Sequence, residues 1–216
     1  MSIASRIQNV FEQAIPEPLQ DSVVVTRFEE LCGALEVQGI ACGELDDETF
    51  RRLALLAWQS PYLTQLCLAD PSGLVYLMQE GNLEEARRLI EYRSLLNPVL
   101  TEPTDMFGAS LRIIHGRELL RIAWRHICDL AEINRLMEEL SDLADCTIQT
   151  VTEYARQNAV AQFGTPESES DENPALAVLA MGKLGGRGLN FSSDVDLLFV
   201  YRGDGNTSGG ESGSIE

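Results

Sequence analysis

The sequence predicts a mainly α-helical protein with a small α/β part towards its C-terminal end. Apolar residues recur at steps of three and four through the first 160 residues, as they do on one face of a helix. A polar, acidic stretch over 164–174 then interrupts this pattern. Two short apolar runs, 176–181 and 195–201, flank a glycine-rich loop, which favours two strands joined by a turn.

Acidic residues, serine and proline in the helical part predict where individual helices begin. The acidic run Asp46–Glu48 precedes the apolar residues Phe50 and Leu53, and acidic side chains suit the first turn of a helix. Ser60 and Pro61 then end this helix and begin the next, because proline is well placed at the first helical position.

The clearest helical pattern covers 104–163. Its two apolar stripes predict two amphipathic helices. The first stripe contains Leu119, Ile122, Ala123, Ile127 and Leu130, and the second contains Ile133, Leu136, Leu140, Leu143, Thr147, Val151 and Tyr154 or Ala155.

Three arginines, Arg117, Arg121 and Arg125, follow one another at steps of four on the first of these helices. They therefore share one helix face. We expect a solvated charged face with acidic neighbours such as Glu118. The alternative is a basic surface for a partner or a phosphate group.

These patterns divide the chain into four parts. Residues 1–163 form a helical N-terminal region, and 164–174 form an acidic linker. Residues 175–202 hold the two strands and the glycine-rich loop. From 203 to 216 the sequence is rich in glycine and serine, so we expect a disordered tail.

The charge of the chain disfavours a broad nucleic-acid surface. Sixteen basic residues stand against 34 acidic residues, which gives a formal net charge of −18. A protein this acidic is repelled by phosphate backbones, although a local basic pocket stays open. The only lysine is Lys183, in the glycine-rich loop.

The cysteines and the N-terminus indicate a cytoplasmic protein. The five cysteines are an odd number without C-x-x-C spacing, and the two histidines do not complete a zinc site. We therefore expect buried free thiols in a reducing compartment. Residues 1–18 do not resemble a signal peptide, and no apolar run approaches the length of a membrane span.

Asp194 and Asp196 are the strongest candidates for chemistry. At positions i and i+2 at the entry of the second predicted strand, they are expected to project from the same face. Two such carboxylates can share Mg²⁺, or Mn²⁺, and Mg²⁺ is commonly held by one or two carboxylates together with substrate phosphates.

The glycine-rich loop over 182–190 would supply the complementary phosphate site. Glycines allow backbone N–H groups to approach phosphate oxygens, and Lys183 and Arg187 add positive charge. The loop has neither the Walker A pattern nor a G-x-G-x-x-G pattern. The alternative interpretation is a plain hairpin in which Asp194 caps a turn.

The run Met181–Phe199 closely resembles a motif of the bacterial glutamine synthetase adenylyltransferase family, whose members are bifunctional adenylylating and adenylyl-removing enzymes of the polymerase-β-like nucleotidyltransferase superfamily. Ten residues separate Lys183 from Asp194, within the usual range of that superfamily. The upstream runs Arg117–Arg125 and Leu140–Asp145 are similar to the helical region that precedes the motif.

This resemblance implies a fold and an activity. Residues 175–202 would begin a polymerase-β-like core, and the Asn190–Ser193 version of the motif resembles the N-terminal, adenylyl-removing unit. In that reaction inorganic phosphate attacks the AMP–tyrosine bond of adenylylated glutamine synthetase, giving ADP and free tyrosine. ATP, ADP and phosphate would be the small substrates, and a PII-type nitrogen-signal protein a further partner.

The resemblance also implies roles for individual residues. Asp194 and Asp196 would hold Mg²⁺ and act in catalysis. Six residues of the motif would line the nucleotide phosphates, namely Gly182, Lys183, Gly185, Gly186, Arg187 and Ser193.

Two departures from the family pattern leave an alternative open. Gly188 stands where the family commonly has glutamate. The third carboxylate of the family lies on a later strand, beyond the end of this sequence, so the chain resembles an N-terminal fragment. The alternative function is a catalytically incomplete helical module that binds glutamine synthetase or a nitrogen-signal protein.

Overall fold

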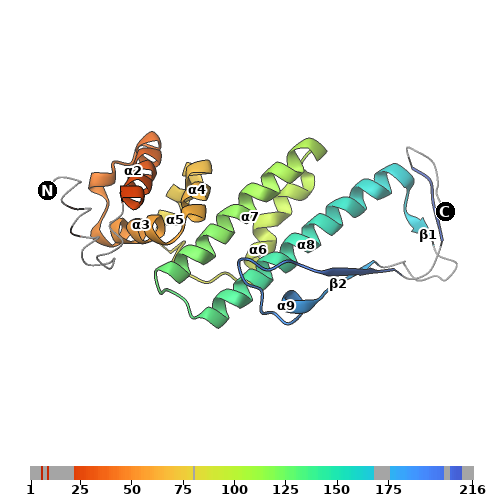
Figure 1. Cartoon of the computed structure of the whole chain (residues 1–216). Helices are drawn as coiled ribbons and strands as arrows, with labels where there is room; N and C mark the ends of the chain where they lie inside the picture. Colours follow the sequence, from red (N-terminus) through yellow and green to blue (C-terminus); the bar gives the residue numbers. More distant parts are fainter. Residues whose placement is uncertain are drawn as a thin grey trace. The chain divides into compact units, whose positions relative to one another are not determined.

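The computed structural model describes Arg6, Asn9 and residues 22–79, 81–167, 176–201 and 205–210. It confirms a mainly α-helical fold with a small strand-containing part (Figure 1). The helical elements are α2 (Ser22–Val37), η2 (Cys42–Glu44), α3 (Asp47–Gln59), α4 (Pro61–Ala69), α5 (Pro71–Met78), α6 (Leu89–Leu96), η3 (Asn97–Thr101), α7 (Thr104–Ile127), α8 (Ile133–Phe163) and α9 (Gly182–Gly185). The strands are β1 (Pro166–Glu167), β2 (Ala177–Ala180), β3 (Leu197–Val200) and β4 (Asn206–Thr207). Among the helices described, none has the length and apolarity needed to cross a bilayer.

The chain divides into two compact units. Residues 1–87 and 112–136 form the first, and residues 88–111 and 137–216 form the second. One boundary lies between residues 87 and 88, just before α6, and the other two fall inside α7 and α8. All three lie within the stretch that the sequence pattern treats as one helical region. The domain boundaries expected after residues 163, 174 and 202 stay predictions.

The predicted helix starts of the first unit are confirmed. Asp46 caps α3 by accepting a hydrogen bond from the backbone N–H of Thr49 at 2.9 Å. Ser60 ends α3 and caps α4, where its hydroxyl accepts from the N–H of Leu63 at 3.2 Å and Pro61 is the first residue. Both caps satisfy N–H groups that have no partner inside the helix.

The core of the first unit is formed by the helices α2, α3, α4 and α5 together with the second half of α7. The rings of Phe28 and Phe50 are 4.8 Å apart at its centre, and both are fully buried. Trp124 of α7 is also buried, and its indole N–H donates to the carbonyl oxygen of Arg52 at 3.0 Å. This bond satisfies the polar atom of an otherwise apolar ring.

The arginine stripe of α7 is not a solvated face, so that prediction is wrong for Arg121 and Arg125. Both side chains are buried, and each guanidinium donates to the carbonyl oxygen of Glu85, at 2.9 and 3.1 Å. Arg117 pairs with Asp70 at 2.8 Å. The face is covered by the segment before α6, which helical periodicity alone could not reveal.

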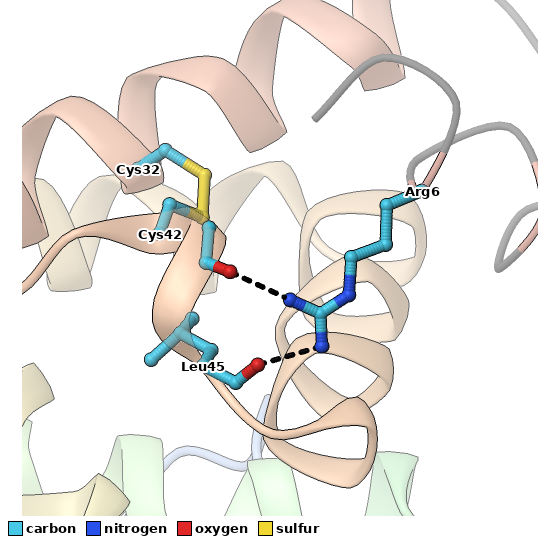
Figure 2. Close-up of a disulfide and its surroundings, with 5 residues drawn as sticks. Arg6, Cys32, Cys42 and Leu45 are labelled. Carbon is cyan, nitrogen blue, oxygen red and sulfur yellow. Dashed lines mark hydrogen bonds between the residues drawn. A yellow bond between two sulfur atoms is a disulfide. The ribbon is translucent and has the colours of Figure 1, made fainter. Parts of the chain in front are cut away.

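The expectation of five free thiols is also wrong. Cys32 of α2 and Cys42 of η2 form a disulfide across ten residues of sequence (Figure 2). The guanidinium of Arg6 lies beside it and donates to the carbonyl oxygens of Gly43 and Leu45, at 3.2 and 2.6 Å. Cysteine spacing could not identify this pair, because a disulfide depends on how α2 and η2 approach each other. The other three cysteines, Cys67, Cys128 and Cys146, are free and buried, as expected.

In the second unit, α6 contacts both α8 and η3. Tyr92 of α6 is fully buried, and its hydroxyl donates to the buried carboxylate of Glu139 at 3.4 Å. Further along α8 the ring of Tyr154 stacks on Phe107, with centroids 3.7 Å apart. The second predicted apolar stripe is buried at Leu136, Leu140 and Leu143 but exposed at Ile133 and Val151.

Strands β2 and β3 form an antiparallel ribbon, which confirms the two predicted strands. Leu179 pairs with Leu198, and Ala180 pairs with Leu197. The short strands β1 and β4 pair with each other, so part of the tail expected to be disordered lies in a strand. Residues 168–174 of the predicted linker, and 203, 204 and 211–216 of the tail, lie outside the described residues.

Candidate functional site

The glycine-rich loop begins where β2 ends. The backbone N–H of Met181 donates to the carbonyl oxygen of Asp196 at 2.9 Å, which continues the ladder of the ribbon by one residue. Gly182 then turns the chain with a φ of +57°, a left-handed conformation that favours glycine, and begins the single turn of α9. The start of the loop and Asp196 are therefore neighbours.

Gly185 is required by a close approach inside the loop. A Cβ atom at this position would lie 2.5 Å from the carbonyl oxygen of Ala180, too near for any side chain. At the adjacent Gly186 the nearest atom, the carbonyl oxygen of Gly182, would be 3.5 Å away, which is ordinary contact. The glycine content of the loop thus has a structural cause at 182 and 185.

Several backbone N–H groups of the loop are already bonded within it. Gly185 donates to Met181, Gly186 to Gly182, Arg187 to Leu184 and Gly188 to Lys183, over 2.8 to 3.2 Å. These amides close the turn, so they cannot also bind a phosphate group while the loop keeps this conformation. For Gly185 and Gly186, both predicted to line phosphates, that role requires a local change.

Asp194 and Asp196 lie in the extended segment immediately before β3, and both are exposed. Within the part of the chain that the structure describes, no side chain pairs with either carboxylate. Exposed carboxylates without a partner suit a hard cation such as Mg²⁺. No third histidine, cysteine, aspartate or glutamate joins them among the described residues, so this part of the chain supplies at most two such ligands.

Lys183 lies one residue into the loop, and its side chain is exposed. As with the two aspartates, no described residue pairs with its ammonium group. Among the basic residues predicted to bind phosphate, Lys183 thus keeps a charge that is not neutralised by a neighbour.

Arg187 differs from Lys183, because its charge is already matched. Its guanidinium lies 2.5 Å from the carboxylate of Asp142 and 3.4 Å from that of Asp145, both on α8. The hydrogen bond to Asp142 raises the pKa of Arg187 above its ordinary value. Burial raises the pKa of Asp145, while the charge of Arg187 opposes that rise.

Ser193 is held in a turn with Asn190. Its hydroxyl donates to the side-chain oxygen of Asn190 at 2.6 Å, and its N–H donates to the carbonyl oxygen of Asn190 at 3.2 Å. The turn leads directly into Asp194. The structure therefore gives Ser193 a role in shaping the approach to the aspartates, while its predicted contact with phosphate stays a prediction.

Sequence reasoning missed the support that α8 provides. Ser141 is fully buried, and its hydroxyl accepts a hydrogen bond from the N–H of Leu189 at 3.4 Å. Asp142 and Asp145, which follow Ser141 on the same helix, form ion pairs with Arg187. The signal was available, since the run Leu140–Asp145 shares the resemblance with the motif, but the sequence does not show that the two segments touch.

Comparisons with known proteins assign the sequence of this chain to one family. Residues 50–216 match the sequence profile described as glutamate-ammonia ligase adenylyltransferase. This match covers most of the chain and includes α8, the glycine-rich loop and both aspartates. The chain belongs to the glutamate-ammonia ligase adenylyltransferase family.

Individual relatives agree with this assignment. The chain is 32% identical over 200 residues to a bifunctional glutamine synthetase adenylyltransferase/adenylyl-removing enzyme of Thioalkalivibrio sulfidiphilus, which covers 90% of this chain and 20% of the relative. A protein of the same description from Shewanella loihica is 33% identical over 207 residues, which is 94% of this chain and 21% of the relative. A third, from Mannheimia haemolytica, is 43% identical over 112 residues, which is 52% of this chain and 12% of the relative. The chain thus spans about a fifth of the length of the first two relatives.

Proposed function

We propose that this chain is part of an enzyme that controls glutamine synthetase, and that it belongs to the half that removes AMP from a tyrosine by phosphorolysis. The observation that carries this proposal is the neighbouring placement of the Lys183 turn and Asp196, which are joined through the Met181–Asp196 backbone bond. A cationic turn beside two carboxylates that no described side chain pairs with suits a metal-bound phosphate or nucleotide.

The roles of the residues follow from this placement. Asp194 and Asp196 would hold Mg²⁺, or Mn²⁺, which would supply charge neutralisation at the phosphates. The Lys183 ammonium would bind a phosphate oxygen of ADP, ATP or the attacking inorganic phosphate. The Ser193–Asn190 turn would keep the two aspartates at the start of β3.

The proposed reaction balances without an oxidant or a reductant. An oxygen of inorganic phosphate attacks the α-phosphorus of the AMP group, and the bond from that phosphorus to the tyrosine oxygen breaks. The proton of the hydrogen phosphate passes to the tyrosine oxygen as it leaves. The products are ADP and the free tyrosine of glutamine synthetase. Adenylylated glutamine synthetase would thus be the macromolecular partner, with a PII-type signal protein as a regulator, and such an exchange would take place in the cytoplasm.

A second candidate is a catalytically incomplete helical module that binds glutamine synthetase or a nitrogen-signal protein. The observation that favours it is that no third acidic side chain joins Asp194 and Asp196 among the described residues. A pair of carboxylates could hold a metal nucleotide without completing the reaction.

Calorimetric titration of the chain with ADP and ATP, with and without Mg²⁺, tests the nucleotide site. We expect metal-dependent binding that Asp194→Ala and Asp196→Ala each abolish, while circular dichroism shows unchanged helical content. Binding as tight in either variant as in the unchanged chain would contradict the assignment of the site.

The direction of the reaction needs a separate assay. The chain is incubated with adenylylated glutamine synthetase and phosphate in one reaction, and with unmodified glutamine synthetase and ATP in another. Formation of ADP in the first supports adenylyl removal, and AMP transfer in the second would support the adenylylating half instead. Binding without turnover in either reaction would favour the second candidate.

A further inference from the structure

Arg187 joins the candidate phosphate loop to α8. Its guanidinium contacts Asp142 and Asp145, which are three residues apart and therefore lie on one face of the helix. The side chain of Arg187 is half exposed, but that of Asp142 is only 14% exposed and that of Asp145 is 33% exposed, so the carboxylate side of the pairs is partly shielded from water. Partial burial strengthens such charge-assisted hydrogen bonds.

The residues that follow Arg187 also rest on α8. Leu189 is buried, and its N–H donates to the hydroxyl of Ser141. The Ser141 hydroxyl in turn donates to the carbonyl oxygen of Met137 at 2.8 Å. A Cβ atom at Gly188 would lie 3.3 Å from the terminal methyl of Met137. The arc 187–189 therefore lies against the part of α8 between 137 and 145.

The same arc is rigidly connected to Lys183. Arg187 has a φ of +54°, a left-handed conformation that is unusual for arginine. Its N–H donates to Leu184 at 2.9 Å, and the N–H of Gly188 donates to the carbonyl oxygen of Lys183 at 2.8 Å. Because these bonds close the turn, a displacement of Arg187 would displace Lys183.

We propose that Arg187 is the anchor of the glycine-rich loop and not a ligand of the phosphate, and that Asp142 and Asp145 are positioning residues. They hold the turn that carries Lys183 in its place beside Asp196. The consequence for nucleotide binding rests on the proposed function, whereas the anchoring itself does not. The sequence predicted that Arg187 binds phosphate, but a guanidinium already matched by two carboxylates has little charge left for an anion.

Two measurements on the whole chain separate the anchor from a phosphate ligand. Amide hydrogen exchange reports the opening of 182–190, and titration with MgADP reports nucleotide binding. The variants are Arg187→Gln, the double substitution Asp142→Asn with Asp145→Asn, and the charge exchange Asp142→Arg with Arg187→Asp. The matched control is Arg156→Gln, which removes the ion pair between Arg156 and Glu153. Both residues lie on α8, beyond the part of the helix that the loop contacts.

We expect Arg187→Gln and the double asparagine variant to speed exchange in 182–190 roughly five- to ten-fold and to weaken MgADP binding similarly, since the lost interaction is a partly buried charge pair. The charge exchange should restore slow exchange, a recovery that a general loss of packing would not give. Arg156→Gln should change neither measurement.

Two results would overturn the anchor. The first is exchange in 182–190 that stays as slow in Arg187→Gln as in the unchanged chain. The second is MgADP binding that Arg187→Gln weakens but the double asparagine variant leaves equal or tighter, because freeing Arg187 from its carboxylates would favour a direct phosphate contact. If the unchanged chain binds no MgADP, the proposed function fails, and the exchange data alone decide the anchor.

Discussion

The guanidinium of Arg121 lies 2.8 Å from the carboxylate of Glu118 one turn earlier on α7, and both side chains are buried. The same carboxylate also forms an ion pair with Arg87, whose Nε lies 3.0 Å from Oε2 of Glu118. One buried carboxylate thus serves two arginines inside the first unit. The cost of removing a buried counter-charge gives the first prediction.

Glu118→Gln should destabilise the chain by about 3 kcal/mol, because it removes a buried carboxylate that pairs with the buried Arg121 and with Arg87, whose side chain is 15% exposed. Urea unfolding followed by circular dichroism measures the change. Glu29→Gln, on the exposed face of α2, is the matched control and should shift the free energy of unfolding by less than about 0.5 kcal/mol. Equal unfolding midpoints for the two variants would mean that the Glu118 pairs contribute nothing.

The disulfide between Cys32 and Cys42 should leave three thiols per chain. Burial raises the pKa of Cys67 to about 12 and that of Cys128 to about 11, so both stay protonated and inert in the folded chain. Titration with a thiol reagent should therefore give three groups after unfolding without reductant, and five after unfolding with it. Five groups without reductant would show that the disulfide does not form.

Closing the loop between α2 and η2 should also stabilise the fold. For a loop of about ten residues the disulfide is expected to contribute roughly 2–3 kcal/mol. Cys42→Ser should lower the free energy of unfolding by about this amount without reductant, and addition of reductant should bring the unchanged chain close to the variant. A chain whose stability does not respond to reductant would contradict this expectation.

Glu48 should make stability depend on pH in the acid range. Its hydrogen bond to Arg51, followed by that to Arg52, lowers its pKa from 4.5 to about 2 in the folded chain. Because the folded pKa lies below the unfolded one, the contribution is fully present above pH 4.5 and is lost as the pH falls towards 2. The side chain is half exposed, so the contribution at neutral pH is below about 1 kcal/mol.

The test for Glu48 compares urea midpoints of the unchanged chain and Glu48→Gln at pH 6 and pH 3. The unchanged chain should be more stable at pH 6, and the difference should shrink at pH 3. A difference that grows on acidification would show that the sign is wrong.

Gly185→Ala and Gly186→Ala form a matched pair in the glycine-rich loop. A methyl group at 185 would meet the carbonyl oxygen of Ala180, whereas at 186 it has ordinary contact distances. We expect Gly185→Ala to cost about 1–3 kcal/mol of local stability and Gly186→Ala to be nearly neutral. Amide exchange of 177–190 measures both, and equal effects would mean that the loop adapts at 185.

Local sequence signals were enough to predict the positions of most of the helices and strands. Capping residues and prolines set the starts of α3 and α4, and apolar spacing predicted α7, α8 and the two strands of the ribbon. Each of these signals acts within a few residues of chain, so it can be recognised without knowing what lies nearby in space. The run Met181–Phe199 likewise carried the family in its order of residues.

Tertiary structure decided which charged and sulfur-containing groups meet. The pairs Glu118–Arg121, Cys32–Cys42 and Arg187–Asp142 depend on the approach of elements distant in sequence or on which helix face is covered. Helical periodicity places arginines on one face but does not say whether protein or water covers that face. For the same reason Arg187 was predicted as a phosphate ligand. Its two carboxylates are supplied by α8, more than 40 residues earlier in the chain.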